Sequence, residues 1–204
     1  MLLGAHCPHC SSVLRSLSVL VEQGVLSKLE VVNLKQRPGI AKELGVRSVP
    51  WVRIGLFELD GLRTLEELKQ WAQTTATLQG VRDYLGAMLA EGEVDRVLAM
   101  IAKENSLMAQ VIELLDDADA KINIRLGIGA IIEEHQGTPL LREYIPQLAK
   151  LTRHLDPRVR GDACHYLALS RSHRAKVYIQ PLLEDENADV REIAGESMLE
   201  LDSE

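Results

Sequence analysis

A short motif that recurs in the second half of the chain constrains its fold more than any other feature. Segment 156–163 has the pattern Asp-Pro-x-Val-Arg-x-x-Ala, and segment 188–194 has the pattern Ala-Asp-Val-Arg-x-x-Ala, with the two valines 31 positions apart. A weaker copy, Ile-Arg-x-x-Ile, begins at Ile124, 35 positions before the first of these valines. An apolar stretch precedes each copy. Repetition at this period indicates pairs of helices that stack, because one pair alone cannot bury its apolar face.

Helical patterns continue from about residue 78 to the end of the sequence. Thr138-Pro139 and Asp156-Pro157 each combine a residue that caps helices with proline, which is tolerated at the first helical position. The expected helices, separated by short breaks, are Gln79–Glu91, Glu93–Lys103, Ser106–Leu115, Asp119–His135, Pro139–Leu155, Pro157–Ser170, Arg174–Leu183 and Asn187–Leu201.

This helix-pair pattern, with Val-Arg-x-x-Ala opening the second helix, resembles HEAT and HEAT-like repeats over residues 78–204. The resemblance implies a curved array whose concave side binds another protein, so a protein partner is expected here. Arg125, Arg160 and Arg191 recur at one position, where we expect hydrogen bonds to carboxylates of the neighbouring repeat; ligand contact is the alternative. No nucleophile–base arrangement, phosphate loop or metal cluster is recognisable in this half, so we assign it no chemistry.

Charge divides the chain near residue 75. Residues 1–74 contain nine Lys and Arg against seven Asp and Glu, whereas residues 75–204 contain fourteen against twenty-three. We therefore predict two domains, 1–74 and 75–204. The acidic second domain argues against a nucleic-acid partner, because neutralising phosphates requires clustered Lys and Arg. No apolar run approaches the roughly 20 residues that span a bilayer, and no secretory signal is recognisable, so we expect no membrane partner.

Cys7 and Cys10 form a C-x-x-C motif between a short apolar run, 2–5, and a helical pattern that ends near Gly24. Pro8 suits the first position of that helix. The third cysteine, Cys164, stands alone in a helical pattern, where we expect it to be packed rather than redox-active. Three cysteines with one close pair differ from the dense, even pattern of secreted disulfide scaffolds, and we expect a cytoplasmic protein.

The rest of the first domain alternates between extended and helical patterns. Thr64 and Glu67 form a capping box for its last helix, which runs to about Ala72. The expected elements are strand 2–5, a helix from residue 8 to about 23, strand 28–34, helix 38–44, extended segment 46–54, strand 57–59 and helix 65–72. The order β-α-β-α-β-β-α predicts a small α/β sandwich, so the whole chain is expected to be α/β plus all-α.

Two motifs in this domain resemble the thioredoxin and glutaredoxin family. Cys7-Pro8-His9-Cys10 opens the first helix, and segment 44–50, Leu-Gly-Val-Arg-Ser-Val-Pro, is similar to the family's stretch before its cis-proline, about forty residues later. The resemblance covers residues 1–74 and departs from thioredoxin at His6, where an aromatic residue is usual. It implies that Pro50 is cis and faces the cysteines, and that substrate backbone pairs with Val49. Trp51 is either part of the docking rim or a half-buried strand residue.

The resemblance also implies a thiol–disulfide oxidoreductase that acts on protein clients and uses no cofactor besides its own disulfide. Cys7 would attack a substrate disulfide as a thiolate, and Cys10 would resolve the mixed disulfide. Pro8 and His9 are expected to tune the stability of the Cys7 thiolate. The Pro-His pair resembles that of strongly oxidising family members, although the redox partner decides whether the protein oxidises, reduces or isomerises.

Three other interpretations of the C-x-x-C motif remain open. Structural zinc would need a second pair of ligands, and only His6 and His9 are close in sequence. Segment 4–10 also resembles the loop of heavy-metal-associated carriers of copper, although Val49-Pro50 in a strand is unfavourable in that fold. Finally, the first domain could be a non-catalytic interaction module. We expect no bound metal and favour the oxidoreductase.

Overall fold

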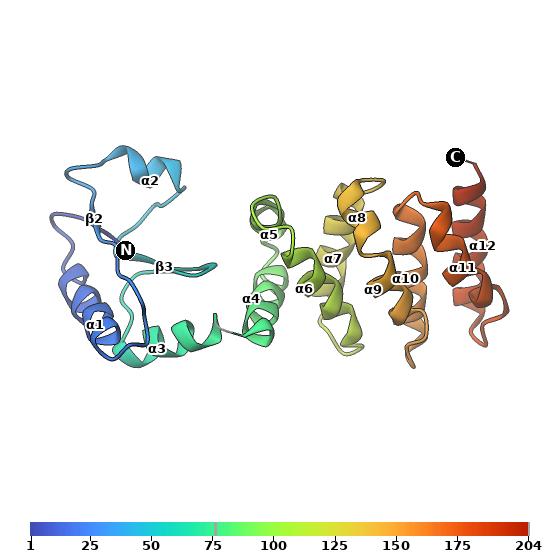
Figure 1. The fold of residues 1–204 in the computed structure, drawn as a ribbon, viewed down its shortest axis with the longest axis horizontal. Coiled ribbons are helices and arrows are strands. Elements are labelled where there is room, and N and C mark those ends of the chain that lie inside the picture. The colour runs from blue at the N-terminus through green and yellow to red at the C-terminus, as the bar shows by residue number, and fades with distance from the viewer. Residues whose placement is uncertain (76, 204) are drawn as a thin grey trace. The chain divides into compact units, whose positions relative to one another are not determined.

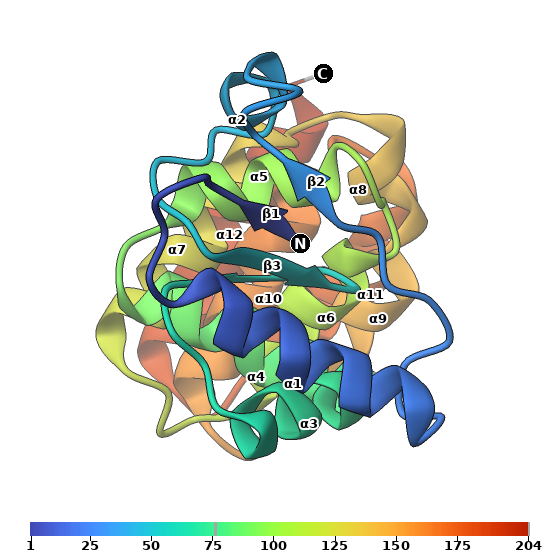
Figure 2. The same ribbon diagram turned by 90° about the vertical axis from the view of Figure 1, so that its left-hand side faces the viewer.

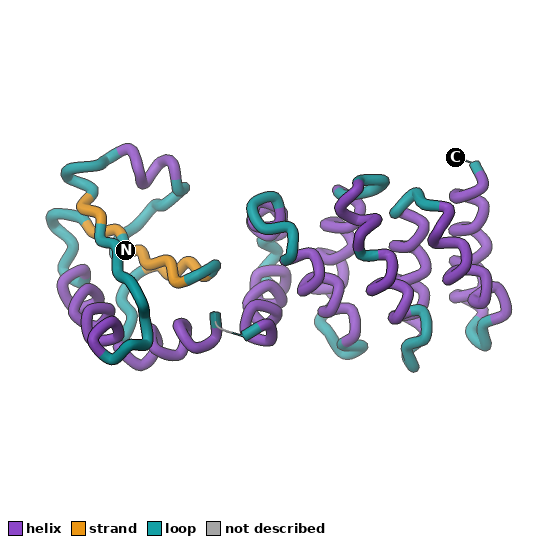
Figure 3. The backbone as a smooth tube through the Cα atoms, viewed as in Figure 1, coloured by secondary structure: helices purple, strands orange, loops and turns teal. Residues whose placement is uncertain are grey.

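The computed structural model describes residues 1–75 and 77–203, which form two compact units, Met1–Val81 and Arg82–Glu204. The division falls within helix α4, whereas the composition predicts a boundary between residues 74 and 75. Strands occur only in the first unit, and the described part of the second is built from helices (Figure 3). No described helix has both the length and the apolar character needed to cross a membrane.

The first unit has the predicted order of elements. They are β1 (Leu2–Leu3), α1 (Cys10–Glu22), β2 (Val32–Asn33), α2 (Gly39–Glu43), β3 (Trp51–Ile54), β4 (Phe57–Asp60) and α3 (Leu65–Thr74) (Figure 1). The sheet order is β2-β1-β3-β4, with β1 parallel to β2 and antiparallel to β3, and with β3 antiparallel to β4. The unit is therefore a small α/β fold around a mixed sheet.

The strands around β1 are shorter than predicted. Strand 28–34 is reduced to Val32–Asn33, because β1 itself offers only Leu2 and Leu3 as parallel partners. The extended segment 46–54 becomes a strand only from Trp51 onward. The hydrophobic pattern identified these segments, but the number of paired residues depends on the neighbouring strand.

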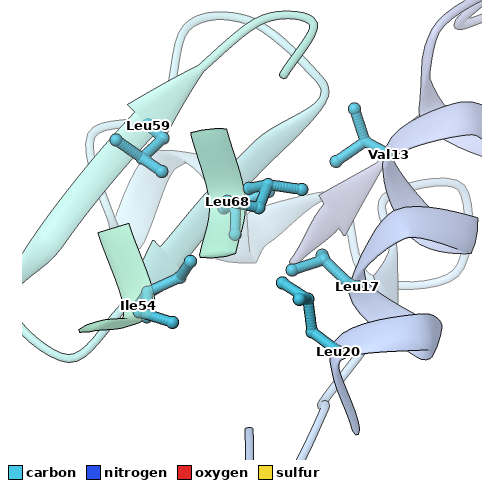
Figure 4. Packing of buried hydrophobic residues seen from close by; sticks show 8 residues of the cluster. Val13, Leu17, Leu20, Ile54, Leu59 and Leu68 are labelled. Atoms are coloured by element: carbon cyan, nitrogen blue, oxygen red, sulfur yellow. The ribbon is translucent and has the colours of Figure 1, made fainter. Parts of the chain in front are cut away.

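A single apolar layer joins the sheet to α1 and α3. Both helices lie on one side of the sheet and α2 lies on the other (Figure 2). The side chains of this layer point toward one another between helix and sheet (Figure 4). Its buried members are Val13, Leu17, Leu20, Val52, Ile54, Leu59, Leu68 and Ala72. This layer fixes α1, and with it the cysteine pair at its start.

The capping box predicted at Thr64 is present. Thr64 Oγ1 accepts from the backbone N–H of Glu67 at 3.2 Å, and the Glu67 carboxylate accepts from the backbone N–H of Thr64 at 2.7 Å. We expect Thr64→Ala to lower the free energy of unfolding by about 1 kcal/mol, because the backbone N–H of Glu67 loses its acceptor and the Glu67 carboxylate loses the hydroxyl donor. Urea unfolding of Thr64→Ala and Thr64→Ser tests this; equal losses in both variants would contradict it.

The second unit is a succession of helices. They are α4 (Leu78–Ala90), α5 (Val94–Ile101), α6 (Leu107–Glu113), η1 (Leu114–Asp116), α7 (Ile122–Glu134), α8 (Pro139–Glu143), α9 (Ile145–Leu151), α10 (Pro157–Leu169), η2 (His173–Ala175), α11 (Lys176–Ile179), η3 (Gln180–Glu184) and α12 (Ala188–Asp202). The caps predicted at Thr138 and Asp156 are confirmed. Helix α10 packs against α7, α9, α11 and α12, so each pair buries its apolar face against its neighbours.

Two predicted helices are interrupted. Segment 139–155 divides at Tyr144, because Pro146 cannot donate the backbone hydrogen bond that would continue α8. Segment 174–183 is split into η2, α11 and η3, with Pro181 in the last of them. Pro146 and Pro181 lie at these breaks, so both interruptions could have been predicted from the sequence.

The recurring arginines join neighbouring elements. Arg125 pairs with Asp162, and Arg160 forms a bidentate pair with Asp185 at 2.7 and 2.8 Å, as predicted. The prediction is wrong for Arg191, whose guanidinium donates to the backbone carbonyls of Asp185 and Glu186. Arg160 likewise donates to the carbonyls of His154 and Leu155, which lie six and five residues before it. Arg160 and Arg191 therefore share one role, which is to hold the turn that precedes their own helix.

Candidate functional site

The cysteine pair lies in the turn between β1 and α1. Cys7 and Cys10 form a disulfide with their Cα atoms 5.5 Å apart, a distance usual for such a bond. Helix α1 begins at Cys10 rather than at Pro8, because its first bond runs from the Val13 N–H to the carbonyl of His9. Pro8 therefore belongs to the turn, and its predicted position as first helical residue is wrong.

The two cysteines differ in exposure. Cys10 is buried, with an exposed fraction of 5%, whereas Cys7 is partly exposed. The neighbours of Cys7 on the surface are exposed, namely His6, Pro8 and His9. Burial follows from position, because Cys10 lies three residues before Val13, on the same buried face of α1. An incoming group can therefore reach one sulfur of the pair and not the other.

The start of α1 provides the electrostatic environment of this pair. The first N–H groups of a helix have no partner within it and give this end partial positive charge. Cys10 is the first residue of α1, and its bond to Cys7 holds both sulfur atoms at this end. The His9 side chain makes no capping hydrogen bond, so it does not compete for these N–H groups. Negative charge on either sulfur is favoured here.

The segment containing Val49 and Pro50 lies next to the strand that leads to Cys7. The Val49–Pro50 peptide bond is cis, as expected. Val49 Cγ2 lies 3.1 Å from where a Cβ on Gly4 would be, so the two segments pack closely, and a larger residue at position 4 would require the Val49 side chain to shift. The Gly4 carbonyl accepts from the N–H of Cys7 at 3.4 Å. Gly4 thus connects the two predicted parts of the site, and the sequence analysis missed it.

Trp51 does not reach the surface beside this site. Its exposed fraction is 4%, and it pairs with Leu2 across the sheet. Trp51 therefore has almost no exposed surface with which to contact a substrate. It is a strand residue, as in the alternative prediction, but it is buried rather than half-buried. Pro50 is also buried, and its carbonyl accepts from Gly61 N–H at 2.8 Å, whereas Val49 is half-buried.

The described residues contain no group of three or more His, Cys, Asp or Glu side chains arranged to hold a metal ion. His6 and His9 are exposed beside the cysteines, but they do not complete such a group with them in this arrangement. The described residues therefore do not supply the second pair of ligands that a structural zinc site would need.

Cys164 is packed inside the second unit, as predicted. It is fully buried in α10, with its sulfur 3.8 Å from Ser197 Oγ. Burial raises the pKa of the Cys164 thiol to about 11, so almost none of it is the reactive thiolate at neutral pH.

We therefore expect iodoacetamide to modify Cys7 in the reduced native protein and to leave Cys164 unmodified until the protein unfolds. Peptide mass mapping after brief labelling measures this, with denatured protein as the control that labels all three cysteines. Rapid native labelling of Cys164 would contradict the packing described above.

No family model, no curated protein and no solved structure matches this sequence in comparisons with known proteins. The function of this protein is therefore inferred from the geometry of the cysteine pair and its surroundings.

Proposed function

We propose that this protein is a thiol–disulfide oxidoreductase in which Cys7 attacks and Cys10 resolves. The difference in exposure between the two cysteines carries the proposal. Cys7 is the cysteine of the pair that is exposed enough to react with a disulfide of another protein. Cys10 is buried and is held within bonding distance of Cys7. The start of α1 favours the Cys7 thiolate, which is the attacking species in disulfide exchange.

The exchange proceeds in two balanced steps. The Cys7 thiolate attacks one sulfur of a client disulfide, and the other client sulfur leaves as a thiolate. The Cys10 thiolate then attacks the Cys7 sulfur, which releases the second client thiolate and forms the Cys7–Cys10 disulfide. The client gains two electrons and the protein loses two. A dithiol reductant returns the pair to its reduced form, and the same steps in reverse oxidise a client.

The surroundings of the pair support a thioredoxin- or glutaredoxin-like domain. The β-α-β-α-β-β-α order of elements and the cis bond before Pro50 are the features expected from that resemblance, and the mixed sheet with α1 and α3 on one side is compatible with it. We propose that extended client backbone docks along Val49, which is half-buried and lies next to the strand before Cys7. Pro8 and His9 then flank the attacking sulfur, and Trp51 supports the strand from within.

We assign the helical unit the role of holding a protein partner, as HEAT-like repeats do. The stacked helices and the arginines that close their turns support this assignment. The unit contributes no chemistry to the exchange, and we propose that the complete protein acts in the cytoplasm.

The insulin reduction assay with dithiothreitol tests the proposal. We expect the wild-type protein to accelerate insulin precipitation above the rate with dithiothreitol alone. If it does not, and binds its partner equally well oxidised and reduced, the protein is a non-catalytic adaptor. Tight, stoichiometric copper(I) binding without reductase activity would instead indicate a metal carrier.

A further inference from the structure

Positive charge is concentrated in the middle of the helical unit. Residues 139–178 contain eight Lys and Arg against three Asp and Glu. The flanking stretches are acidic. Residues 82–138 contain five Lys and Arg against eleven Asp and Glu, and residues 179–204 contain one Arg against nine Asp and Glu. A basic region within an otherwise acidic unit attracts negatively charged partners to one place.

Most cations of this basic region are already engaged within the protein. Arg142 donates to the carbonyl of Ser170 at 3.1 Å. Arg158, Arg160 and Lys176 pair with Asp156, Asp185 and Asp202, and Arg171 also has an interaction partner. Lys150, Arg153 and Arg174, in contrast, are exposed, and none of these three side chains has a partner among the described residues.

Two of these cations, Lys150 and Arg153, border a groove lined by residues of α9, the turn after it and α11. Lys150 lies in the last turn of α9 and Arg153 follows directly after that helix, so both project from one side of it. The groove has a volume of about 270 Å³, and its remaining walls are Pro146, Ala149 and the ring of Tyr178. Three of its five lining residues thus offer apolar or aromatic surface, and the other two carry positive charge.

We infer that this groove binds an acidic peptide segment that inserts one apolar side chain between α9 and α11. Carboxylates on that segment pair with Lys150 and Arg153, and the inserted side chain contacts Pro146 and Tyr178. The inference rests on the proposed function only in that it gives the helical unit a binding surface for its protein partner.

The size and charge of the site favour a peptide over a small molecule or nucleic acid. A groove of about 270 Å³ is smaller than ordinary small-molecule pockets and suits one amino-acid side chain. The two cations that line the groove are too few to neutralise an extended phosphate backbone.

Fluorescence anisotropy with a labelled peptide that carries glutamates on both sides of a central leucine tests the inference. We expect Lys150→Glu with Arg153→Glu to weaken binding about tenfold or more, because two attractive pairs become repulsive. The matched control reverses Lys103 and Lys121, two exposed cations outside the groove, and should change affinity less than about twofold. Tyr178→Ala should weaken the binding of this peptide. It should not change the affinity for a second peptide in which alanine replaces the central leucine, because that peptide has no large side chain to contact Tyr178.

Equal effects of both charge-reversal pairs, or no peptide binding, would overturn the inference. Tighter binding of a short single-stranded RNA than of the peptide, lost on reversal of Lys150 and Arg153, would assign the groove to nucleic acid instead. Dimerisation in sedimentation experiments that disappears with the same reversal would assign it to a second copy. These measurements use the oxidised protein without turnover, so their outcome is independent of the insulin assay.

Discussion

Cys7→Ser is expected to reduce insulin turnover to the rate given by dithiothreitol alone. The variant retains Cys10, but that sulfur has an exposed fraction of only 5% and cannot reach a client disulfide. A serine hydroxyl at position 7 cannot replace it, because the exchange requires a sulfur nucleophile that can also be displaced. The loss therefore reflects chemistry, and circular dichroism should show an unchanged fold.

Two matched variants make this result specific to the attacking cysteine. Cys10→Ser should lose turnover as well, yet it should retain a single attack by Cys7 and accumulate a mixed disulfide. Cys164→Ala should retain full turnover, because that thiol is buried and has a pKa of about 11. Turnover by Cys7→Ser above that with dithiothreitol alone would contradict the assigned roles.

Arg160→Ala is expected to lower the free energy of unfolding of the helical unit by about 3 kcal/mol or more. The side chains of Arg160 and Asp185 have exposed fractions of 9% and 8%, so the substitution leaves a buried carboxylate without its cation. It also removes the donors to the carbonyls of His154 and Leu155. Urea unfolding followed by circular dichroism measures the loss.

Arg158→Ala is the matched control for this measurement. The Arg158 side chain is 63% exposed and pairs with Asp156 at the surface, so its removal should cost less than about 1 kcal/mol. Arg160→Lys should give an intermediate loss, because lysine retains the charge but cannot form the bidentate pair. Equal losses for Arg160→Ala and Arg158→Ala would contradict the structural role of the buried pair.

The same ion pair predicts how the stability of the folded protein changes with pH. Arg160 lowers the pKa of Asp185, so the folded protein holds this carboxylate charged at lower pH than the unfolded chain does. Its contribution to stability is fully present above the pKa of an unfolded aspartate and is lost as pH falls through the lowered value. The difference between wild type and Arg160→Ala should accordingly shrink in acid.

The parts of the fold that depend on local interactions were predictable from the sequence. The Thr64 capping box, the Thr138 and Asp156 caps and the order of strands and helices in the first unit all follow from residues close together in the chain. The position and burial of Cys164 also followed from its helical pattern.

The parts that depend on distant partners were not predictable. The length of β2 is limited by β1, and the burial of Trp51 depends on the sheet and on the groups that cover it. The close packing at Gly4 involves Val49, which lies far along the sequence. The sequence does not show that the Lys150 and Arg153 side chains remain unpaired, because this depends on which carboxylates the fold brings near each cation.

The most direct test of the account is to map the mixed disulfide that each single-cysteine variant forms with an oxidised client peptide. Cys10→Ser should form a stable adduct through Cys7 within the time of one turnover, and Cys7→Ser should form one through Cys10 only after unfolding. Tandem mass spectrometry of the trapped species identifies the linked cysteine. Comparable adduct formation by both folded variants, or by neither, would contradict the assignment of Cys7 as the accessible attacking sulfur.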